Sequence, residues 1–325
     1  MAKVLGIGNA LVDIMTKLDH DKHLDLFKLP KGSMTLADDL LIEEVSRGTL
    51  DMEKIQSSGG SAANTIHGLA RLGVETAFMG KVGKDELGDF FHEDLVKSKI
   101  NPKLFFGKNR SGRAIALVSP DTERTFATYL GAAIELSADD LNPENFEGYD
   151  YFHVEGYLVQ NHSLLEEALR LAKDKGLKVS LDLASYNVVE ENLEFLRMIV
   201  RHYVDIVFAN EEEAKAFTGK DPLQAVEEIS QFAEIAVVKT GRKGSIIQRG
   251  EEIIHVGIID VEPIDTTGAG DLYAAGFLYG LSKAYSLKKC GETGAILGGK
   301  VIEVIGAKMR DETWNEIRQM IAPNN

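Results

Sequence analysis

The second half of the sequence alternates between short apolar runs and longer amphipathic stretches, and this alternation limits the possible folds more than any other feature. The apolar runs have the length of buried strands and occupy residues 151–155, 178–182, 206–210 and 235–239. The stretches between them have helical periodicity and lie near residues 163–175, 188–201 and 211–217. Strands that alternate with helices form a mostly parallel sheet with helices on both faces. The sequence therefore predicts a three-layer α/β fold.

The remaining regular elements are predicted from the same kinds of pattern. Strands are expected at residues 4–8 and 74–80, and a helix is expected at residues 85–98. Two runs around Gly250, at residues 245–249 and 252–256, have the pattern of a hairpin, and most of residues 287–305 has a helical pattern.

Two segments of the first half do not fit a regular strand–helix unit. Residues 14–57 carry proline and glycine between short apolar pieces, and two alternating runs flank a Pro-Asp turn at residues 119–123. We expect two insertions, at about 14–57 and 108–131, to form a small β lid. The rest of the chain is expected to form one domain over residues 1–325.

Charge and cysteine content restrict the partners and the setting. The chain has 36 Lys and Arg against 51 Asp and Glu, which gives a formal net charge of −15. This balance argues against duplex nucleic acid or an anionic membrane as the main partner. Cys290 is the only cysteine, so no intrachain disulfide can form and a cytoplasmic location is expected. We expect a small-molecule partner and a monomer or homodimer.

Residues 265–271 read Asp-Thr-Thr-Gly-Ala-Gly-Asp and precede a helical pattern. An extended apolar segment at residues 258–261 comes before them, so we expect a strand, a glycine-rich turn and a helix. Because Gly268 and Gly270 lack a Cβ, the backbone can turn tightly and its N–H groups can face an anion at the helix start. Asp271 beside that anion suits a base that takes a proton from an attacking hydroxyl. The alternative is an ordinary helix N-cap with a flexible approach.

Polar residues also follow the first predicted strand and open the next helical pattern. Asn9 and Asp13 come at the carboxyl end of that strand, where open α/β sheets bind ligands. The run from Gly59 to Asn64 contains small residues that let a ligand approach the backbone, and the Asn64 amide can both donate and accept. The alternatives are turn chemistry for Asn9 and Asp13, and tight helix–sheet packing for the small residues.

Two further motifs suit a nucleotide and its metal ion. Asn210 and Glu213 end a strand and open a helix, and they are assigned to Mg2+ indirectly, because Mg2+ usually keeps several waters. Residues assigned to a nucleotide phosphate follow the next strand, and they are Lys239, Thr240, Gly241 and Gly244. The alternatives are acids that complement a helix dipole and a basic surface turn.

Two other glycine patterns are rejected. Residues 294–301 almost match a P-loop, but Val301 stands where Ser or Thr should bind Mg2+ and the preceding stretch is helical, so we interpret them as a helix face of small residues. Gly6 and Gly8 match the start of a dinucleotide fingerprint, but Leu11 replaces its third glycine, which argues against an NAD-dependent dehydrogenase. The intact Asp271 argues against a catalytically inactive nucleotide sensor.

In their order along the chain, these motifs resemble the signatures of the ribokinase-like (PfkB) family of carbohydrate and nucleoside kinases. Gly59 to Gly88 is similar to its N-terminal signature, Asn210 to Glu213 is similar to its Asn-x-x-Glu element, and residues 265–271 match its C-terminal signature. The resemblance implies a ribokinase-like fold, ATP and Mg2+ as cofactors, and transfer of the ATP γ-phosphoryl group to a hydroxyl.

The same resemblance implies roles for the residues of the C-terminal signature. Asp271 would be the catalytic base, and the backbone of Gly268, Ala269 and Gly270 would form the anion hole. Thr266 would join the cofactor site. The family also offers a monovalent-cation site, here near Asp265 and Thr267, as in ribokinases.

Within the family, residues 8–13 and 121–133 look like the adenosine kinase branch. By this resemblance the ribose hydroxyls would be held by Asn9, Asp13, Gly60 and Asn64. Arg124 would approach the transferred phosphate, and Tyr157 would lie against the base. The acceptor implied is the 5'-hydroxyl of a purine nucleoside, adenosine first. Glu155 departs from the small residue common in that branch, and the alternative acceptor is ribose, fructose or a related sugar.

Overall fold

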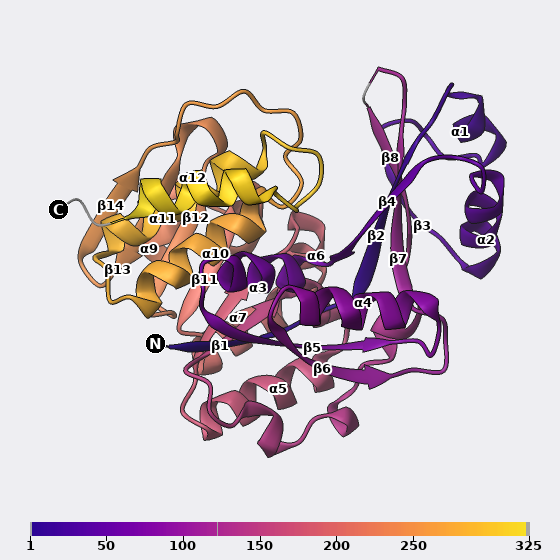
Figure 1. Ribbon diagram of the computed structural model, residues 1–325. Helices are drawn as coiled ribbons and strands as arrows, with labels where there is room; N and C mark the ends of the chain where they lie inside the picture. The colour runs from indigo at the N-terminus through magenta and orange to yellow at the C-terminus, as the bar shows by residue number, and fades with distance from the viewer. Residues whose placement is uncertain (1, 122, 323–325) are drawn as a thin grey trace.

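The computed structural model describes residues 2–121 and 123–322, and nine strands form its main sheet (Figure 1). They lie across the sheet in the order β14-β13-β12-β11-β10-β9-β1-β5-β6. Their bounds are β1 Lys3–Ile7, β5 Glu75–Val82, β6 Ile100–Phe106, β9 Tyr151–Glu155, β10 Lys178–Asp182, β11 Ile206–Asn210, β12 Ile235–Lys239, β13 Ser245–Arg249 and β14 Glu252–Val256. Neighbours from β6 to β12 are parallel, and β13 and β14 add an antiparallel edge. The predicted mostly parallel sheet is confirmed.

Helices cover both faces of this sheet. One face carries α3 Ser61–Arg71, α4 Glu86–Lys97, α10 Ala269–Ser282, α11 Leu287–Val301 and α12 Asp311–Ile321. The other carries α5 His162–Asp174, α6 Tyr186–Glu191, α7 Leu193–Tyr203, α8 Glu211–Thr218 and α9 Pro222–Ile229. Because successive side chains of a strand point to opposite faces, Val4 enters one core and its neighbour Leu5 enters the other. The three-layer architecture is therefore confirmed.

Short 3₁₀ helices connect several of these elements. Their bounds are η1 Gly131–Glu135, η2 Ala138–Asp140, η3 Pro143–Phe146, η4 Gly156–Gln160 and η5 Gly241–Lys243.

A second sheet of five strands stands beside the main sheet (Figure 1). Its order is β3-β8-β7-β2-β4, with bounds β2 Leu11–Lys17, β3 Met34–Leu36, β4 Lys54–Gly59, β7 Gly112–Val118 and β8 Arg124–Tyr129. The predicted hairpin of β7 and β8 is confirmed by their antiparallel pairing, although its turn includes Thr122, which lies outside the described residues. The first insertion also contains α1 Lys22–Leu26 and α2 Asp39–Gly48, two helices that the sequence patterns did not predict.

Two expectations about local structure need correction, and three further elements were not predicted. Residues 258–261 form no strand, because β14 ends at Val256 and Ile258 is 58% exposed instead of paired with a neighbour. The helix expected at 188–201 is two helices that meet at Asn192. The further elements that were not predicted are β6, α9 and α12, the last of which is built around the buried Trp314.

The P-loop-like residues 294–301 lie within α11, as interpreted from the sequence. A Cβ on Gly276 of α10 would lie 2.6 Å from the Thr293 carbonyl oxygen, so small residues are required where α10 and α11 pack. Among the described helices, none combines the length and apolar composition needed to cross a bilayer.

Candidate active site

Five polar residues stand in a row at one edge of the main sheet. Lys239 ends β12, Asn210 ends β11, Asp182 ends β10, Glu155 ends β9, and Asn9 follows β1. These strands are parallel neighbours, so their carboxyl ends meet at the same edge. Open α/β sheets bind ligands at this edge.

The helix α10 brings Asp271 to this row. Gly268 is the N-cap of α10 with φ 76°, and Asp271 lies in the first turn instead of capping it. One carboxylate oxygen accepts from Ser61 Oγ (2.7 Å) and the other from Asn64 Nδ2 (2.9 Å). Burial raises the pKa of Asp271 from 3.8 to about 6, although these two donors oppose the shift. A carboxylate with that pKa is ionised near neutral pH and is basic enough to take a proton.

The start of α10 also offers backbone donors. The N–H of Ala269 donates to the Thr266 carbonyl (3.2 Å), whereas Gly270 and Asp271 occupy positions whose N–H groups have no intrahelical acceptor. A Cβ added to Gly270 would lie 3.0 Å from Lys239 Nζ. An anion at this helix start would therefore meet N–H groups beside a buried ammonium.

Lys239 lies among carboxylates. Its Nζ is 2.9 Å from Asp182 Oδ2, and both side chains are largely buried. Burial lowers the pKa of Lys239, but the charges of Asp182 and Glu213 outweigh that effect and the pKa is raised. The residue assigned to a nucleotide phosphate is thus a charged group held by Asp182, a residue that the sequence patterns did not single out.

Asn210 and Glu213 bond to each other. The Asn210 backbone N–H and Nδ2 donate to the two oxygens of Glu213 (2.8 and 2.6 Å), and the Glu213 N–H donates to Asn210 Oδ1 (2.8 Å). This reciprocal cap is what the helix-start alternative predicts. Glu213 is nevertheless buried, and burial with the charge of Asp182 raises its pKa to about 7. Within the described residues no cluster of His, Cys, Asp and Glu forms a direct metal site.

The turn after β12 is shaped largely by its own packing. Thr240 Oγ1 donates to the Gly244 carbonyl (3.0 Å), and a Cβ on Gly244, whose φ is 89°, would lie 1.9 Å from the Val256 carbonyl oxygen. Gly241 also has a positive φ of 55° but faces open space. The structure of the turn by itself therefore explains Thr240 and Gly244, without a bound phosphate.

The residues assigned to the acceptor gather around the start of α3. A Cβ on Gly60 would lie 2.2 Å from the Asn9 carbonyl oxygen, and a Cβ on Gly59 would lie 2.2 Å from Asp13 Oδ2. Burial raises the pKa of Asp13 to about 7, although Lys308 opposes the shift. The structure thus brings Asn9, Asp13 and Gly60 together, and Asn64 joins them through Asp271.

Glu155 connects the residues of this region. Its Oε1 accepts from the Asn9 N–H (2.9 Å) and Asn9 Nδ2 (2.7 Å), and its Oε2 accepts from the Ala62 N–H (3.0 Å). Burial raises the pKa of Glu155 to about 7, although these donors oppose the shift. Glu155 is 1% exposed.

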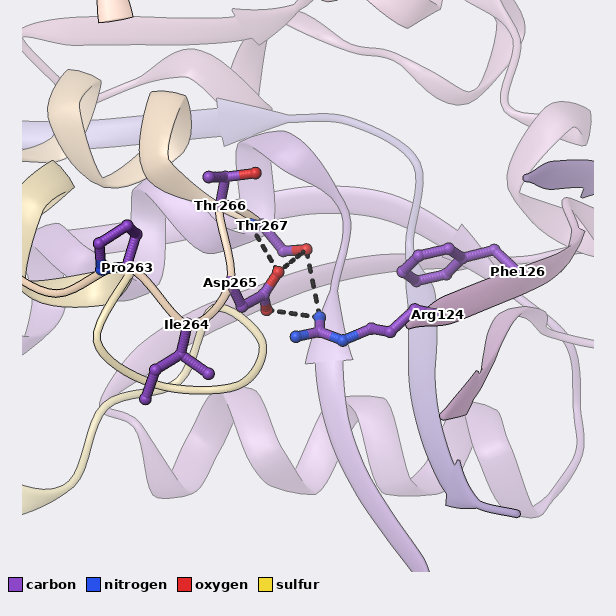
Figure 2. Close-up of a pocket in the computed structure, with 7 residues that line it drawn as sticks. All are labelled: Arg124, Phe126, Pro263, Ile264, Asp265, Thr266 and Thr267. Carbon is purple, nitrogen blue, oxygen red and sulfur yellow. Dashed lines mark hydrogen bonds and ion pairs between the residues drawn. The ribbon is translucent and has the colours of Figure 1, made fainter. Parts of the chain in front are cut away.

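Arg124 reaches from β8 of the small sheet to the glycine-rich loop, as Figure 2 shows. Its guanidinium lies 2.5 Å from Asp265 Oδ2 and 3.5 Å from Thr267 Oγ1. Burial opposes ionisation of Asp265, but Arg124 and the N–H groups of Gly306 and Thr267 lower its pKa. A pocket of about 400 Å³ lies here, lined by Arg124, Phe126, Pro263, Ile264, Asp265, Thr266 and Thr267.

Three aromatic side chains of the acceptor region and the small sheet differ in exposure. Tyr157 lies in η4 directly after β9 and is 42% exposed, so its ring is available at the sheet edge. Tyr129 is buried, and the Arg113 guanidinium lies 5.8 Å from its ring centre. Tyr129 is therefore a packing residue of the small sheet, whereas Phe126 lines the pocket.

Sequence reasoning missed Asp182 and Lys308 as members of this region, and it assigned no role to Ser61 within the run from Gly59 to Asn64. Lys308 Nζ donates to Ser58 Oγ (3.2 Å) from a loop distant in sequence. Burial lowers the pKa of Lys308 to about 8, against the charges of Asp94 and Asp13. The sequence could have indicated Asp182, because it is a polar residue at the end of a buried strand. No sequence pattern indicates Lys308, which lies in a loop.

Known proteins are similar to this chain over most of its length. The model of the pfkB family of carbohydrate kinases matches residues 47–314. An adenosine kinase structure from Sinorhizobium meliloti is 34% identical, covers 98% of this chain and 99% of its own, and has a TM-score of 0.86. A probable sugar kinase from Rhizobium etli CFN 42 is 33% identical, with 98% of both chains covered and a TM-score of 0.86. An uncharacterized sugar kinase of Archaeoglobus fulgidus is 29% identical over 74% of this chain and 96% of its own.

A family model that covers most of the chain, together with relatives of this similarity, decides the membership. PfkB kinases use ATP, generally with Mg2+, and phosphorylate an alcohol group. The chain belongs to the pfkB family of carbohydrate kinases and is a phosphotransferase with a ribokinase-like fold and an alcohol acceptor.

Proposed function

We propose that this kinase phosphorylates the 5'-hydroxyl of a purine nucleoside, with adenosine as the first candidate. One observation carries the choice: a half-exposed aromatic side chain, Tyr157, follows β9 at the sheet edge where Asn9 and Asp13 gather. A purine offers a flat face to such a ring, and aromatic pairs add about 0.5–1.5 kcal/mol beyond burial. The similarity to the Sinorhizobium meliloti adenosine kinase supports the same choice.

In this proposal Asp271 takes the proton of the acceptor hydroxyl as that oxygen attacks the γ-phosphorus, and the bond from this phosphorus to the β-phosphate oxygen breaks to release ADP. Ser61 and Asn64 hold its two carboxylate oxygens, so the base is fixed in orientation before the acceptor binds. The N–H groups at the start of α10 and the guanidinium of Arg124 stabilise negative charge on the transferring group.

The metal assignment rests on the donors at the carboxyl ends of β10 and β11. Asp182 and Glu213 supply buried carboxylate oxygens beside the expected phosphates. Mg2+ prefers oxygen ligands and usually keeps several waters, so these carboxylates would hold it through bound water. Mg2+, when bound with ATP, neutralises charge on the phosphate oxygens. Asn210 fixes the Glu213 carboxylate in place.

The small sheet acts as a lid over one kinase domain in this proposal. Arg124 ties the lid strand β8 to Asp265 and Thr267 at the approach to α10. Closure over the substrates would exclude water and limit ATP hydrolysis. We include no monovalent cation, because Arg124, Thr267 and Gly306 already occupy the Asp265 carboxylate.

A sugar kinase is the second candidate. The acceptor atoms of Asn9, Asp13 and Asn64 suit hydroxyl groups of any polyol, and the Rhizobium etli and Archaeoglobus fulgidus relatives carry sugar kinase names. Ribose and fructose are the sugars to compare.

The test compares kcat/KM for adenosine, inosine, guanosine, ribose and fructose by coupled ADP release. Tyr157→Ala should lower kcat/KM for the preferred nucleoside by about tenfold while changing ribose little. Tyr203→Ala is the matched control, since Tyr203 ends α7 just before β11 begins, at the opposite edge of the sheet. A free sugar that outperforms every nucleoside would overturn the nucleoside assignment and leave the sugar kinase in its place.

A further inference from the structure

The Glu155 carboxylate lies at the centre of the hydrogen bonds in the acceptor region. An ionised carboxylate only accepts hydrogen bonds, and Glu155 receives three, from the backbone and side chain of Asn9 and from the backbone of Ala62. Gly8 makes this approach possible, because a Cβ there would lie 2.3 Å from Glu155 Oε2. A side chain that is 1% exposed and bonded in this way has one orientation.

The consequence for Asn9 follows from its amide chemistry. Only the NH2 group of a carboxamide donates, so the 2.7 Å contact with Glu155 assigns Nδ2 to that side and leaves Oδ1 as the atom free to face a ligand. The backbone N–H of Asn9 bonds to the same carboxylate oxygen, which holds the residue at two points. A flip of this amide would set two acceptors against each other.

A second amide in the region is fixed in the same sense. Asn64 Nδ2 donates to Asp271 Oδ2, and Asn64 Oδ1 is buried without a hydrogen-bond partner in the described structure. A buried acceptor without a partner costs free energy until a donor arrives. The nearby Asp13 carboxylate also only accepts when ionised.

We propose that Glu155 is a positioning residue that fixes the Asn9 amide, so that the acceptor pocket presents oxygen acceptors and selects substrates by their hydroxyl donors. This inference rests on the proposed function for the choice of test compounds, because it places the acceptor beside Asn9 and Asn64. Glu155 thereby determines which atom of the Asn9 amide faces the acceptor, as Asp271 does for Asn64.

A fixed Asn9 amide predicts a particular loss of specificity when Glu155 is changed. Wild-type enzyme should prefer adenosine to 2'-deoxyadenosine or 3'-deoxyadenosine by about tenfold or more in kcat/KM, since a missing hydroxyl leaves an acceptor unpaired. Glu155→Gln replaces one acceptor oxygen by a donor and frees the Asn9 amide to turn. Of the two deoxyadenosines, the test uses the one with the lower kcat/KM in wild type. The ratio of kcat/KM for adenosine to that for this compound should then fall by about tenfold in Glu155→Gln.

The assay should be run at pH 8, above the pKa of about 7 to which burial raises Glu155. KM for the acceptor should rise while KM for ATP stays within about twofold. If Glu155 acts through Asn9, adding Glu155→Gln to the Asn9→Ala variant should not change the ratio of kcat/KM for adenosine to kcat/KM for the deoxy compound. If Glu155→Gln fails to fold, Gly8→Ala displaces the same carboxylate and should change the ratio in the same direction.

The control is Asp182→Asn, a buried carboxylate paired in register with Glu155 but bonded to Lys239 instead of Asn9. Asp182→Asn should lower kcat but leave the ratio of kcat/KM for adenosine to that for the deoxy compound unchanged. A Glu155→Gln enzyme that loses activity equally on hydroxyl and deoxy acceptors, or a wild type that does not discriminate, would overturn the proposal. If ribose proves the better acceptor, the same ratio is measured with ribose and 2-deoxyribose, so failure of the nucleoside assignment stays separate.

Discussion

Replacing Asp271 by Asn should strongly reduce turnover and at the same time make the protein more stable. The base contributes typically about 10²–10⁴-fold to rate, so kcat should fall by that factor. The stability change comes from burial, which raises the pKa of Asp271 from 3.8 to about 6. A shift of about 2 units corresponds to roughly 3 kcal/mol of differential free energy.

The sign follows from linkage. A carboxyl whose pKa is raised on folding contributes stability below its unfolded pKa of 3.8, and that contribution is lost as the pH rises through about 6. At pH 8 the native state therefore carries the full cost of a buried charge, which the neutral amide removes. With an unfolding entropy of about 2 cal/mol/K per residue, about 3 kcal/mol corresponds to an increase in Tm of roughly 4 °C.

The hydrogen bonds of the site allow this substitution. In the Asp271→Asn variant, Ser61 can still donate to the side-chain oxygen that remains, and the Asn64 amide can turn because its Oδ1 has no partner. Differential scanning calorimetry at pH 8 and pH 5 measures the gain, which should shrink at the lower pH. Asp265→Asn is the matched control, and its stability should change in the opposite direction. Arg124 helps to lower the pKa of Asp265, so the ionised carboxylate stabilises the fold and the Tm of the Asp265→Asn variant should fall. An Asp271→Asn protein that retains turnover, or is no more stable at pH 8, would refute the reasoning.

The other predictions concern the metal and the lid. Glu213→Gln should raise the Mg2+ concentration for half-maximal rate several-fold, because a carboxylate at the expected phosphate site is neutralised; an unchanged Mg2+ titration would leave only the helix-capping role. Arg124→Ala should lower kcat by about 10–100-fold and Arg124→Lys by less, since both remove the fork but only Ala removes the charge. Equal rates for Ala and Lys variants would argue against contact with the transferred phosphate, and steady-state kinetics with varied ATP measures the difference.

The sequence was sufficient for eight of the nine strands of the main sheet, because hydrophobic periodicity reports burial directly, but β6 was not predicted. The strands β9 to β14 were predicted within a residue, since each is a short apolar run bounded by a turn. The segment 258–261 misled the same reasoning: it is apolar, but no neighbouring strand pairs with it after β14 ends at Val256. Apolar character alone does not distinguish a paired strand from an irregular one.

Site residues could be predicted where they form one continuous sequence motif. They were harder to predict where their contacts are with residues distant in the sequence. Asp271 and its glycines form one continuous motif, so the sequence predicted a helix start there. The partners of Asp271, Ser61 and Asn64, come from more than 200 positions away in the chain, and only folding brings them together. Glu155 was noted as an unusual residue, but its bonds to Asn9 and Ala62 could not be inferred from spacing.

The position of β1 has a consequence for how the chain assembles. This strand pairs with β5 on one side and β9 on the other, as Val4 does with Thr76 and Tyr151. During synthesis the first strand therefore cannot pair until residues about 70 and 150 positions later have been made, whereas β9 to β14 each pair with a strand that is adjacent in the chain. Pairings of such long sequence separation are slow to form.

The seam between β1 and β9 divides the molecule into a fragment with the small sheet and a fragment with α10. Gly148 is an exposed residue shortly before β9, with φ 82° and no atom within 4 Å of the position that a Cβ would take. Asp271 belongs to the second fragment, while the two side chains that hold its carboxylate, Ser61 and Asn64, belong to the first. Turnover by a chain cut at Gly148 would thus report pairing of β1 with β9, which makes catalysis a readout of this long-range contact.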